Sequence, residues 1–242
     1  MNSLKKLNDF KSILSDYQIS EKSKSILSST PLVLLVATTS SGRNTILREL
    51  VKTGQFHYIV SDTTRKPRIN DGVKEKNGTE YWFKSEDEFL KSLKNGEYIE
   101  AAIIHNQQVS GISVKELQRA KQAGKIPITD IEVIGVENIV KLKNDTTCIF
   151  VVPPDFKEWQ RRIQHRGYMD SAEYKRRLQS ALSELQAALE QKRYIFVIND
   201  TVDKAVDRIQ KIVKGQIDQN YQQKAKKITK DLFNKTKTAL NK

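Results

Sequence analysis

The chain of 242 residues has a single cysteine, Cys148, so it cannot form an internal disulfide or a cysteine-based zinc site. Its three histidines, His57, His105 and His165, are scattered, which argues against a histidine-rich metal site. No apolar run approaches the ~20 residues that a membrane-spanning helix needs. The N-terminus lacks the apolar stretch of a signal peptide. We therefore expect a protein without a membrane span that works in the reducing cytoplasm.

Acidic residues are outnumbered by basic ones, 29 against 42, and the net charge is +13. This excess indicates an anionic partner or substrate. Residues 214–242 hold eight lysines and two aspartates, whereas residues 31–213 have a net charge of only +5. A mildly basic central region suits the binding of phosphates better than the wrapping of long nucleic acid. The lysine-rich tail is expected to be a solvated helix; contact with RNA or a membrane surface is the alternative.

Strands and helices alternate along the chain, which predicts a parallel sheet with helices on both faces. The apolar run Leu32–Val36 predicts a buried strand, and a polar loop and a helix at 44–52 follow it. Residues 61–80 are expected to form a loop. After residue 214 the apolar spacing predicts either an extension of the last helix or a separate amphipathic helix. The remaining strands are expected at 56–60, 81–83, 98–104, 126–133, 148–152 and 194–198, and the remaining helices at 1–30, 85–95, 114–122, 156–165, 171–190 and 202–213.

The loop at residues 37–45, ATTSSGRNT, lies between the first strand and its helix, where phosphate-binding loops of the pattern G-x-x-x-x-G-K-[ST] occur. Gly42 fits this pattern. Ala37, Arg43 and Asn44 replace its first glycine, its lysine and its hydroxyl residue. Backbone N–H groups and a helix N-terminus can still cradle a phosphate, and Arg43 keeps the positive charge. A plain strand–turn–helix connection is the alternative.

A second set of motifs is more specific. Residues 60–68 read VSDTTRKPR, residues 77–83 read NGTEYWF and residues 98–100 read YIE. They resemble the guanylate kinase family, whose patterns are V-S-x-T-T-R-x-P-R, G-x-x-Y-x-F and F-x-E. Weaker matches are DIE followed by Gly135, RRIQHRG at 161–167, KRRL at 175–178 and VIND at 197–200. The resemblance extends from about residue 31 to residue 213.

This resemblance implies an α/β fold with a P-loop NTPase-type parallel sheet, helices on both faces, a small mixed GMP-binding insertion and a helical lid. Residues 31–213 would form the guanylate kinase-like domain. The insertion would occupy about 62–113 and the lid about 154–178. Residues 1–30 would be an N-terminal helical extension, and residues 214–242 a lysine-rich helical tail.

The resemblance also implies phosphoryl transfer from Mg·ATP to GMP, giving ADP and GDP. Asn44 and Thr45 would face Mg²⁺. The implied ATP-binding residues are Thr39, Ser40, Ser41, Gly42, Arg43, Asn44, Thr45 and Asn199. The residues implied in catalysis are Arg43, Arg162, Arg166, Arg177 and Asp130. The arginines would stabilise charge on the transferred group, and Asp130 would hold the water shell of the metal or orient an arginine.

For the acceptor, the implied GMP-binding residues are Ser61, Arg65, Arg68, Tyr81, Glu100, Ser110, Asp130 and Glu132. Two arginines three positions apart can bind one phosphate together. A carboxylate such as Glu100 can accept from guanine N1–H and N2–H₂, which adenine lacks, and Ser61 would donate to O6. A phosphate-binding tyrosine of the family is missing from residues 107–113, where Ser110 or Gln108 would substitute.

Two other functions remain open. A guanylate kinase-like module that has lost catalysis and binds a protein partner is favoured by the altered loop and the missing tyrosine. The retained guanine-reading and lid residues favour the enzyme. A nucleic-acid binder using the basic tail is the third possibility, although the central region has no basic motif interleaved with aromatic residues.

Overall fold

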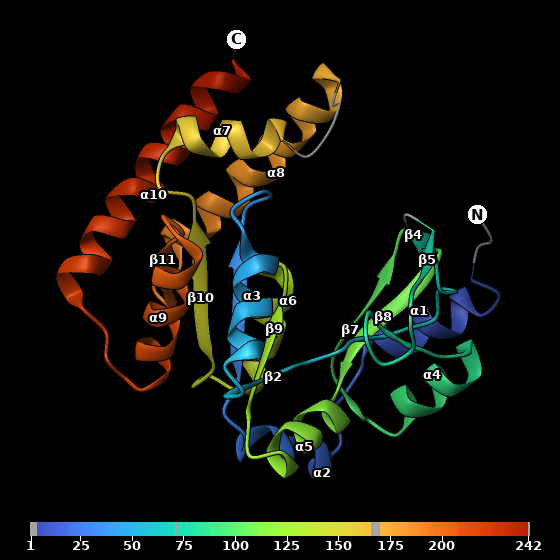
Figure 1. Ribbon diagram of the computed structural model, residues 1–242. Helices are drawn as coiled ribbons and strands as arrows, with labels where there is room; N and C mark the ends of the chain where they lie inside the picture. Colours follow the sequence, from blue (N-terminus) through green and yellow to red (C-terminus); the bar gives the residue numbers. More distant parts are fainter. Residues whose placement is uncertain (1–3, 71, 166–169, 242) are drawn as a thin grey trace. The chain divides into compact units, whose positions relative to one another are not determined.

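The computed structural model describes residues 4–70, 72–165 and 170–241 (Figure 1). Within this described part, no helix combines the length and apolarity needed to cross a membrane. The chain forms two compact units, each described by itself below. The first unit comprises residues 1–32, 56–127 and 138–145, and the second comprises residues 33–55, 128–137 and 146–242.

The second unit is built on parallel strands in the order β11-β10-β1-β9. In the register of β1, Val33 lies opposite Thr147 on one side and Ile128 on the other. Every residue of β1 is buried, which explains its continuous apolar sequence. The bounds are β1 (Val33–Ala37), β9 (Ile126–Asp130), β10 (Thr147–Val152) and β11 (Tyr194–Ile198).

Helices flank these strands (Figure 1). Four of them begin at a side-chain cap, where an oxygen accepts a backbone N–H of the first turn; the caps are Asp155, Asp170, Thr201 and Asp218. The helices are α3 (Arg43–Lys52), α6 (Val133–Leu142), α7 (Phe156–Gln164), α8 (Ser171–Glu190), α9 (Val202–Val213) and α10 (Gln219–Leu240); residues 138–142 of α6 fall in the first unit.

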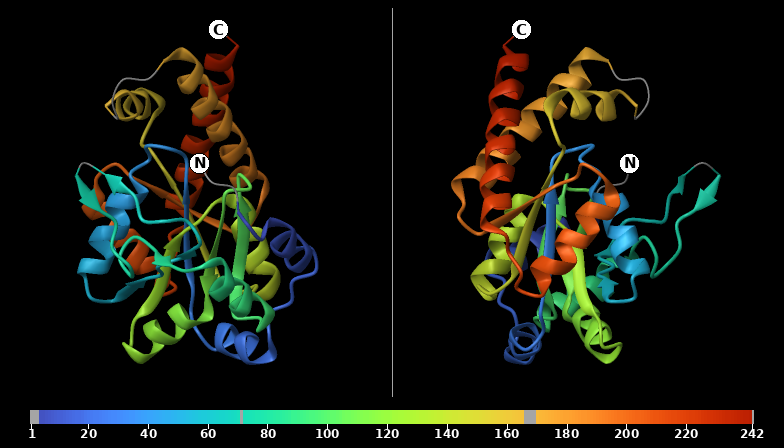
Figure 2. Two further views of the ribbon diagram at one scale, coloured as in Figure 1. Left: turned by 90° about the vertical axis from the view of Figure 1, so that its right-hand side faces the viewer. Right: turned by 60° about the vertical axis from the view of Figure 1, so that its left-hand side comes forward.

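The lysine-rich tail forms the separate helix α10, which runs alongside α8 (Figure 2). Its buried residues, Ala225, Thr229, Leu232 and Thr236, recur at helical spacing and form the packed face. The expectation of a solvated helix is therefore wrong for this face, whereas lysines occupy the exposed one.

The start of α10 also contacts the backbone of β11. The Gln222 amide accepts from Phe196 N (2.8 Å) and donates to Phe196 O (3.0 Å). The Tyr221 hydroxyl accepts from Ile198 N (2.7 Å), and Arg208 of α9 donates to Ile198 O (3.0 Å). Arg208 in turn lies over the Tyr221 ring, with its guanidinium carbon 4.7 Å from the ring centroid.

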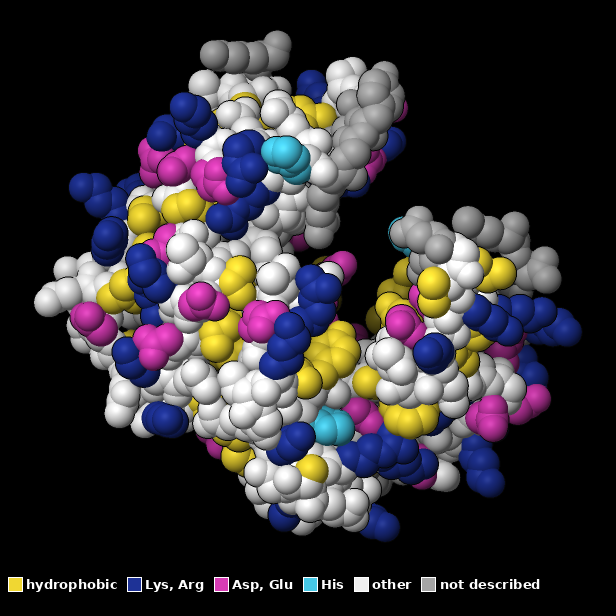
Figure 3. All heavy atoms as spheres, in the orientation of Figure 1, with side chains coloured by type: hydrophobic (Ala, Val, Ile, Leu, Met, Phe, Trp, Pro, Cys, Tyr) yellow, Lys and Arg dark blue, Asp and Glu magenta, His cyan; other side chains and the backbone are white. Residues whose placement is uncertain are grey.

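Basic and acidic side chains are interspersed on the surface shown in Figure 3. Several lysines pair with an aspartate four positions earlier on the same helix or at its start. These exposed pairs contribute little to stability. In each pair, the charge of an aspartate offsets the charge of a lysine. The pairs are Lys204–Asp200, Lys211–Asp207 and Lys235–Asp231.

The first unit contains a four-stranded sheet in the order β6-β3-β8-β7. β8 runs antiparallel to both of its neighbours, and β7 has a bulge between Tyr98 and Glu100. Its strands are β3 (Asp62–Thr63), β6 (Trp82–Phe83), β7 (Tyr98–Ile104) and β8 (Gln108–Ser113); β2 (Phe56–Tyr58) and the hairpin strands β4 (Ile69–Asn70) and β5 (Val73–Lys74) also belong to this unit.

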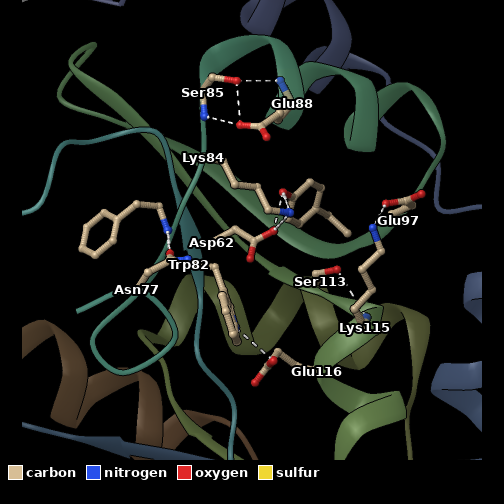
Figure 4. Close-up of polar contacts among 12 residues, drawn as sticks. Asp62, Asn77, Trp82, Lys84, Ser85, Glu88, Glu97, Ser113, Lys115 and Glu116 are labelled. Carbon is tan, nitrogen blue, oxygen red and sulfur yellow. Dashed lines mark hydrogen bonds and ion pairs between the residues drawn. The ribbon is translucent and has the colours of Figure 1, made fainter. Parts of the chain in front are cut away.

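The helices of the first unit are α1 (Leu7–Ser15), α2 (Glu21–Ser28), α4 (Glu86–Lys94) and α5 (Val114–Gln122). The predicted capping box at the start of α4 is present, with Ser85 and Glu88 bonded to each other's backbone (Figure 4). Phe10 of α1 is fully buried against Phe89, with ring centroids 6.1 Å apart. The N-terminal helices are thus part of this unit's core.

Several predicted elements need correction. The strand expected at 126–133 ends at Asp130, and α6 begins at Val133 in a segment where no helix was expected. β8 was not predicted either. The segment 61–80, expected to be a loop, contains the short strands β3, β4 and β5. The strands β3, β4, β5 and β8 are formed by pairing with neighbouring strands, where local sequence signals were weak.

Candidate active site

The loop between β1 and α3 is tightly folded. Ser41 N donates to Thr38 O (3.2 Å), and the hydroxyls of Thr38 and Ser41 lie 2.6 Å apart. Gly42 precedes α3 with φ +89°, the left-handed conformation that glycine tolerates best. A Cβ atom there would overlap the Asn199 amide. The loop therefore requires glycine at this position for both backbone and space.

Asn199, at the end of β11, fastens this loop to the rest of the second unit. Its Nδ2 donates to Ser41 O (2.7 Å), and its own backbone oxygen accepts from Arg162 Nη2 of α7 (3.1 Å). Trp159, also in α7, donates from Nε1 to Thr39 O (2.8 Å). The predicted site residues Asn199 and Arg162 therefore lie beside the loop as expected.

The loop lines a cavity of about 280 Å³ formed by residues 37–45 together with Glu132 and Glu184. All of the predicted loop residues, from Thr39 to Thr45, line it. Ser40 Oγ and one Glu184 carboxylate oxygen are buried without a hydrogen-bond partner among the described residues. Burial raises the pKa of Glu184 to about 7, although nearby Arg43 opposes the shift. The cavity thus offers backbone donors, hydroxyls and carboxylates, the mixture that a hydrated metal–phosphate group requires.

Arg43 and Asp130, both predicted to take part in catalysis, form an ion pair with Nη2 and Oδ2 2.7 Å apart. About a quarter of each side chain is exposed, 26% and 24%. Asp130 ends β9, and its neighbour Ile131 donates N–H to Leu35 O of β1 (3.1 Å). The pair therefore anchors the guanidinium at the carboxyl end of the sheet, where ligands of α/β folds bind.

The predicted lid arginines lie on α7 and α8. Arg162 is held by Glu158 (2.9 Å), and hydrogen bonds from Arg161 and then Arg162 lower the pKa of Glu158 to about 2. Arg177 is held by Glu173 (2.8 Å). Arg177 also lines a second cavity of about 280 Å³. The other lining residues are Thr39, Glu173, Arg176, Ser180 and Glu184. Arg166 lies outside the described residues.

In the first unit, the predicted GMP-phosphate residues gather around Glu75. Arg65 donates to both Glu75 oxygens (2.5 and 2.9 Å), and Arg68 donates its backbone N–H to the same carboxylate (2.7 Å). These bonds, chiefly those from Arg65, lower the pKa of Glu75 to about 2. The Arg65 guanidinium lies 4.8 Å from the centre of the Tyr81 ring. The structure therefore brings together Arg65, Tyr81 and the backbone of Arg68, and the Arg68 side chain is exposed.

The predicted base-reading residues come from neighbouring elements of the same unit. Ser61 directly precedes β3, and its backbone oxygen accepts from Trp82 N (2.9 Å). Glu100 follows the bulge in β7. Ser110 of β8 donates to the Thr63 hydroxyl (3.0 Å), and Gln108 approaches Ser110 at 3.5 Å. Asp130, predicted for catalysis and GMP binding, and Glu132, predicted for GMP binding, belong to the second unit.

Comparisons with known proteins identify the family of this chain. A model of the guanylate kinase family matches residues 28–216. The chain belongs to the guanylate kinase family. It is 33% identical over 188 residues to a guanylate kinase of Latilactobacillus sakei, which covers 76% of this chain and 89% of that protein. It is 35% identical over 190 residues to one of Lactobacillus johnsonii, covering 76% and 88%.

Among solved structures, the crystal structure of a guanylate kinase from Anaplasma phagocytophilum is similar, with a TM-score of 0.55 and 26% sequence identity over 78% of this chain and 88% of that chain. The family resemblance and the α/β fold with a central parallel sheet are therefore confirmed. Both α1 and α10 lie outside the residues that the guanylate kinase family model matches.

Several residues that hold the predicted site residues were not predicted from the sequence. Glu75, Glu158 and Glu173 each hold a predicted arginine. Glu158 and Glu173 lie four positions before Arg162 and Arg177, so helical spacing could have identified them. Glu184 lies seven positions after Arg177, on the same side of α8. Glu75 carried no such signal, because its pairing depends on a loop.

Proposed function

We propose that this protein transfers a phosphoryl group from Mg·ATP to GMP, giving ADP and GDP. The observation that carries the proposal is the loop cavity of the second unit. It combines the N-terminus of α3, the required Gly42 and the Arg43–Asp130 pair in one place. Phosphates bind readily at such a helix start, because its N–H groups and dipole favour anions. Family membership supplies the substrates.

In this proposal the loop residues and Asn199 hold ATP. Among the described residues no three His, Cys, Asp or Glu side chains gather to hold a metal. This composition fits Mg²⁺, which commonly binds substrate phosphates and water with only one or two protein ligands. The Thr45 hydroxyl and the Asn44 carbonyl would hold the ion, and the buried Ser40 hydroxyl is a donor for phosphate oxygen. When bound, Mg²⁺ neutralises charge on the β- and γ-phosphates.

The acceptor site uses the first unit. Arg65, Arg68 and Tyr81 bind the GMP phosphate, and Ser61 and Glu100 read the guanine edge. Glu75 already holds the Arg65 guanidinium in a fixed orientation, so little side-chain entropy remains to be lost when a phosphate binds. Ser110 takes the place of the missing tyrosine, and Asp130 and Glu132 complete the acceptor set.

Phosphoryl transfer requires no nucleophilic side chain, because a GMP phosphate oxygen attacks directly. Arg43, Arg162, Arg166 and Arg177 stabilise the charge that spreads over the transferring group, and Asp130 orients Arg43. A cytoplasmic location, where both nucleotides are available, belongs to the same proposal.

The test is release of ADP from Mg·ATP in the presence of GMP, with AMP, UMP and CMP as alternative acceptors. We expect release that depends on GMP. The variant Glu100→Gln should raise the KM for GMP, whereas the matched control Glu97→Gln, at a carboxylate paired with Lys115, should not. Folded protein that releases no ADP with any acceptor contradicts the proposal and points instead to an interaction module.

A further inference from the structure

A buried polar chain of contacts crosses the sheet of the first unit, and the proposed function does not use it. Asp62 of β3 accepts a hydrogen bond from the Tyr98 hydroxyl of β7 (2.6 Å). Asp62 also forms an ion pair with Lys84, which follows β6 (Figure 4). The Asp62 side chain is only 3% exposed, and Tyr98 is fully buried. We call the contacts Lys84–Asp62–Tyr98 the cross-brace.

The cross-brace connects strands that are not neighbours. The sheet order is β6-β3-β8-β7, so the Tyr98 ring must pass over β8 to reach Asp62. Gly111 of β8 lies on this path, because it pairs with Asp62 on one side and Ala101 on the other. It has no side chain, so the ring can pass over it. A Cβ atom on Gly111 would lie 2.7 Å from Glu100 O and 3.0 Å from Tyr98 Cδ1. Any larger residue would therefore displace the ring.

Both ends of the cross-brace are next to residues assigned to the guanine. Asp62 directly follows Ser61, and Tyr98 lies two positions before Glu100, across the bulge in β7. A bulge turns the side chains beside it, so the direction of Glu100 depends on how this bulge is held.

Tyr17, in the N-terminal helical region, holds the backbone of Tyr98 in place. The Tyr17 hydroxyl accepts from Tyr98 N (2.8 Å) and donates to Tyr98 O (2.9 Å). The Phe89 ring stacks on the Tyr98 ring, with centroids 4.4 Å apart and planes 9° from parallel. Burial, followed by the charge of Asp62, raises the pKa of Tyr98, so its hydroxyl remains a donor.

The cross-brace is a feature of this chain rather than of the motif it carries. The F-x-E pattern has phenylalanine where Tyr98 stands, and phenylalanine cannot bond to a carboxylate. The position of Asp62 is variable in the V-S-x-T-T-R pattern. A buried carboxylate is costly without partners, so Asp62 and Tyr98 depend on each other.

We propose that the cross-brace is a positioning device for base recognition. It holds Ser61 and Glu100 at the separation at which one donates to guanine O6 and the other accepts from N1–H and N2–H₂. This inference rests on the proposed function, because it assumes that the first unit binds GMP. Asp62, Tyr98 and Lys84 act through Ser61 and Glu100 and do not touch the nucleotide.

The test measures binding of GMP and IMP by calorimetry in the full-length protein, so that it does not depend on turnover. IMP lacks the N2 amino group that Glu100 reads. We expect Tyr98→Phe to raise the Kd for GMP tenfold or more and the Kd for IMP less, so that the preference for GMP shrinks. The Kd for Mg·ATP should stay within twofold. The matched control is Tyr194→Phe, which removes a buried hydroxyl of the second unit that has no hydrogen-bond partner among the described residues.

Further variants separate positioning from folding. The double variant Asp62→Ala/Tyr98→Phe should bind GMP no more weakly than the single variant with the lower GMP affinity. Both changes break the same hydrogen bond, between the Tyr98 hydroxyl and Asp62. Tyr17→Phe keeps the cross-brace but loses the two bonds to the Tyr98 backbone. It should shift GMP binding in the same direction, by a smaller factor, even where Tyr98→Phe fails to fold.

The outcomes distinguish the two proposals. In one outcome the natural protein binds GMP, and both Tyr98→Phe and Tyr17→Phe bind it equally well. That result overturns the positioning role and leaves the proposed function standing. An equal loss of GMP and IMP affinity also overturns it, because a general disturbance of the site does not change base preference. Failure of the natural protein to bind GMP overturns both.

Discussion

At the scale of single residues, the loop between β1 and α3 depends on contacts that few side chains permit. Gly42 has a positive φ and lies against Asn199, which in turn holds Ser41 and Arg162. Asn199 therefore links the loop, the end of β11 and the helix α7. The altered loop residues Ala37 and Asn44 leave this arrangement intact.

Gly42→Ala should destabilise the protein by more than backbone strain alone. That strain costs roughly 1–2 kcal/mol for a residue with a left-handed backbone conformation. Gly54→Ala is the matched control, because Gly54 has φ +78° and nothing within 4 Å of the added Cβ. Urea unfolding should show a larger loss for Gly42→Ala, together with a raised KM for ATP. Equal losses in the two variants would show that the contact with Asn199 carries no energy.

Arg43 stands where the phosphate-loop pattern has lysine. Arg43→Ala should lower kcat by about 10²–10³, the usual effect of removing a group that stabilises transition-state charge. Arg43→Lys keeps the charge but loses the fork that bonds Asp130, so kcat should stay within about tenfold. Steady-state kinetics with GMP and Mg·ATP measure both. An alanine variant with undiminished kcat would exclude Arg43 from the reaction.

Glu184 should make stability depend on pH. Its pKa is raised from 4.5 to about 7, so the folded protein binds a proton that the unfolded chain has released in this range. Stability is therefore lost as pH rises from about 4.5 to about 7. Glu184→Gln should match the natural protein at pH 4 and exceed it at pH 8, by at most roughly 3 kcal/mol. Thermal unfolding at both pH values measures this, with the exposed Glu190→Gln on the same helix as control. A pH-independent difference would contradict the buried, protonated carboxyl.

The identity of the candidate site residues could be predicted from the sequence, whereas their partners mostly could not. A motif states which side chains recur at a spacing, and Arg65 and Arg162 were found in this way. The motif did not show that Glu75 occupies the Arg65 guanidinium, because the bond joins two parts of a loop whose path depends on tertiary contacts. The roles of all the candidate site residues remain predictions.

At the scale of elements, α10 is a packed component of the second unit. Leu232 is only 1% exposed and belongs to the face that meets α8. Leu232→Ala should lower the free energy of unfolding by about 2–5 kcal/mol, the usual cost of truncating a buried leucine. Asn234→Ala, on the exposed side of the same helix, should change it by less than about 0.5 kcal/mol. Denaturant unfolding that cannot distinguish the two variants would contradict the packing of α10.

Element prediction succeeded where local pattern and tertiary environment agreed. The apolar run of β1 identified a buried parallel strand, and Ser85 with Glu88 identified the start of α4. β8, with the sequence QVSGIS, has too few apolar residues to signal a strand and is stabilised by pairing on both sides. α6 was missed because apolar residues continue from β9 into the helix, so the pattern does not mark where the strand ends.

At the scale of the whole molecule, the proposed ATP-binding residues belong to the second unit, and the proposed GMP-binding residues other than Asp130 and Glu132 belong to the first. Hydrogen exchange followed by mass spectrometry should separate these two sets, because a ligand slows exchange of the backbone that it stabilises. GMP alone should protect segments within residues 56–127, and a non-hydrolysable Mg·ATP analogue should protect segments within residues 33–55 and 146–213. Protection of the same segments by both ligands would contradict the assignment of one substrate to each unit.

The contacts between α10 and β11 also affect how this protein behaves at high concentration. β11 is the last strand of its sheet, and an uncovered edge strand can pair with a strand of another molecule and start aggregation. Here the Gln222 amide makes the two hydrogen bonds with Phe196 that an added strand would make. Tyr221 and Arg208 occupy the backbone groups of Ile198. The tail therefore closes this edge of the sheet against strand addition, and loss of these side chains would expose it to self-association.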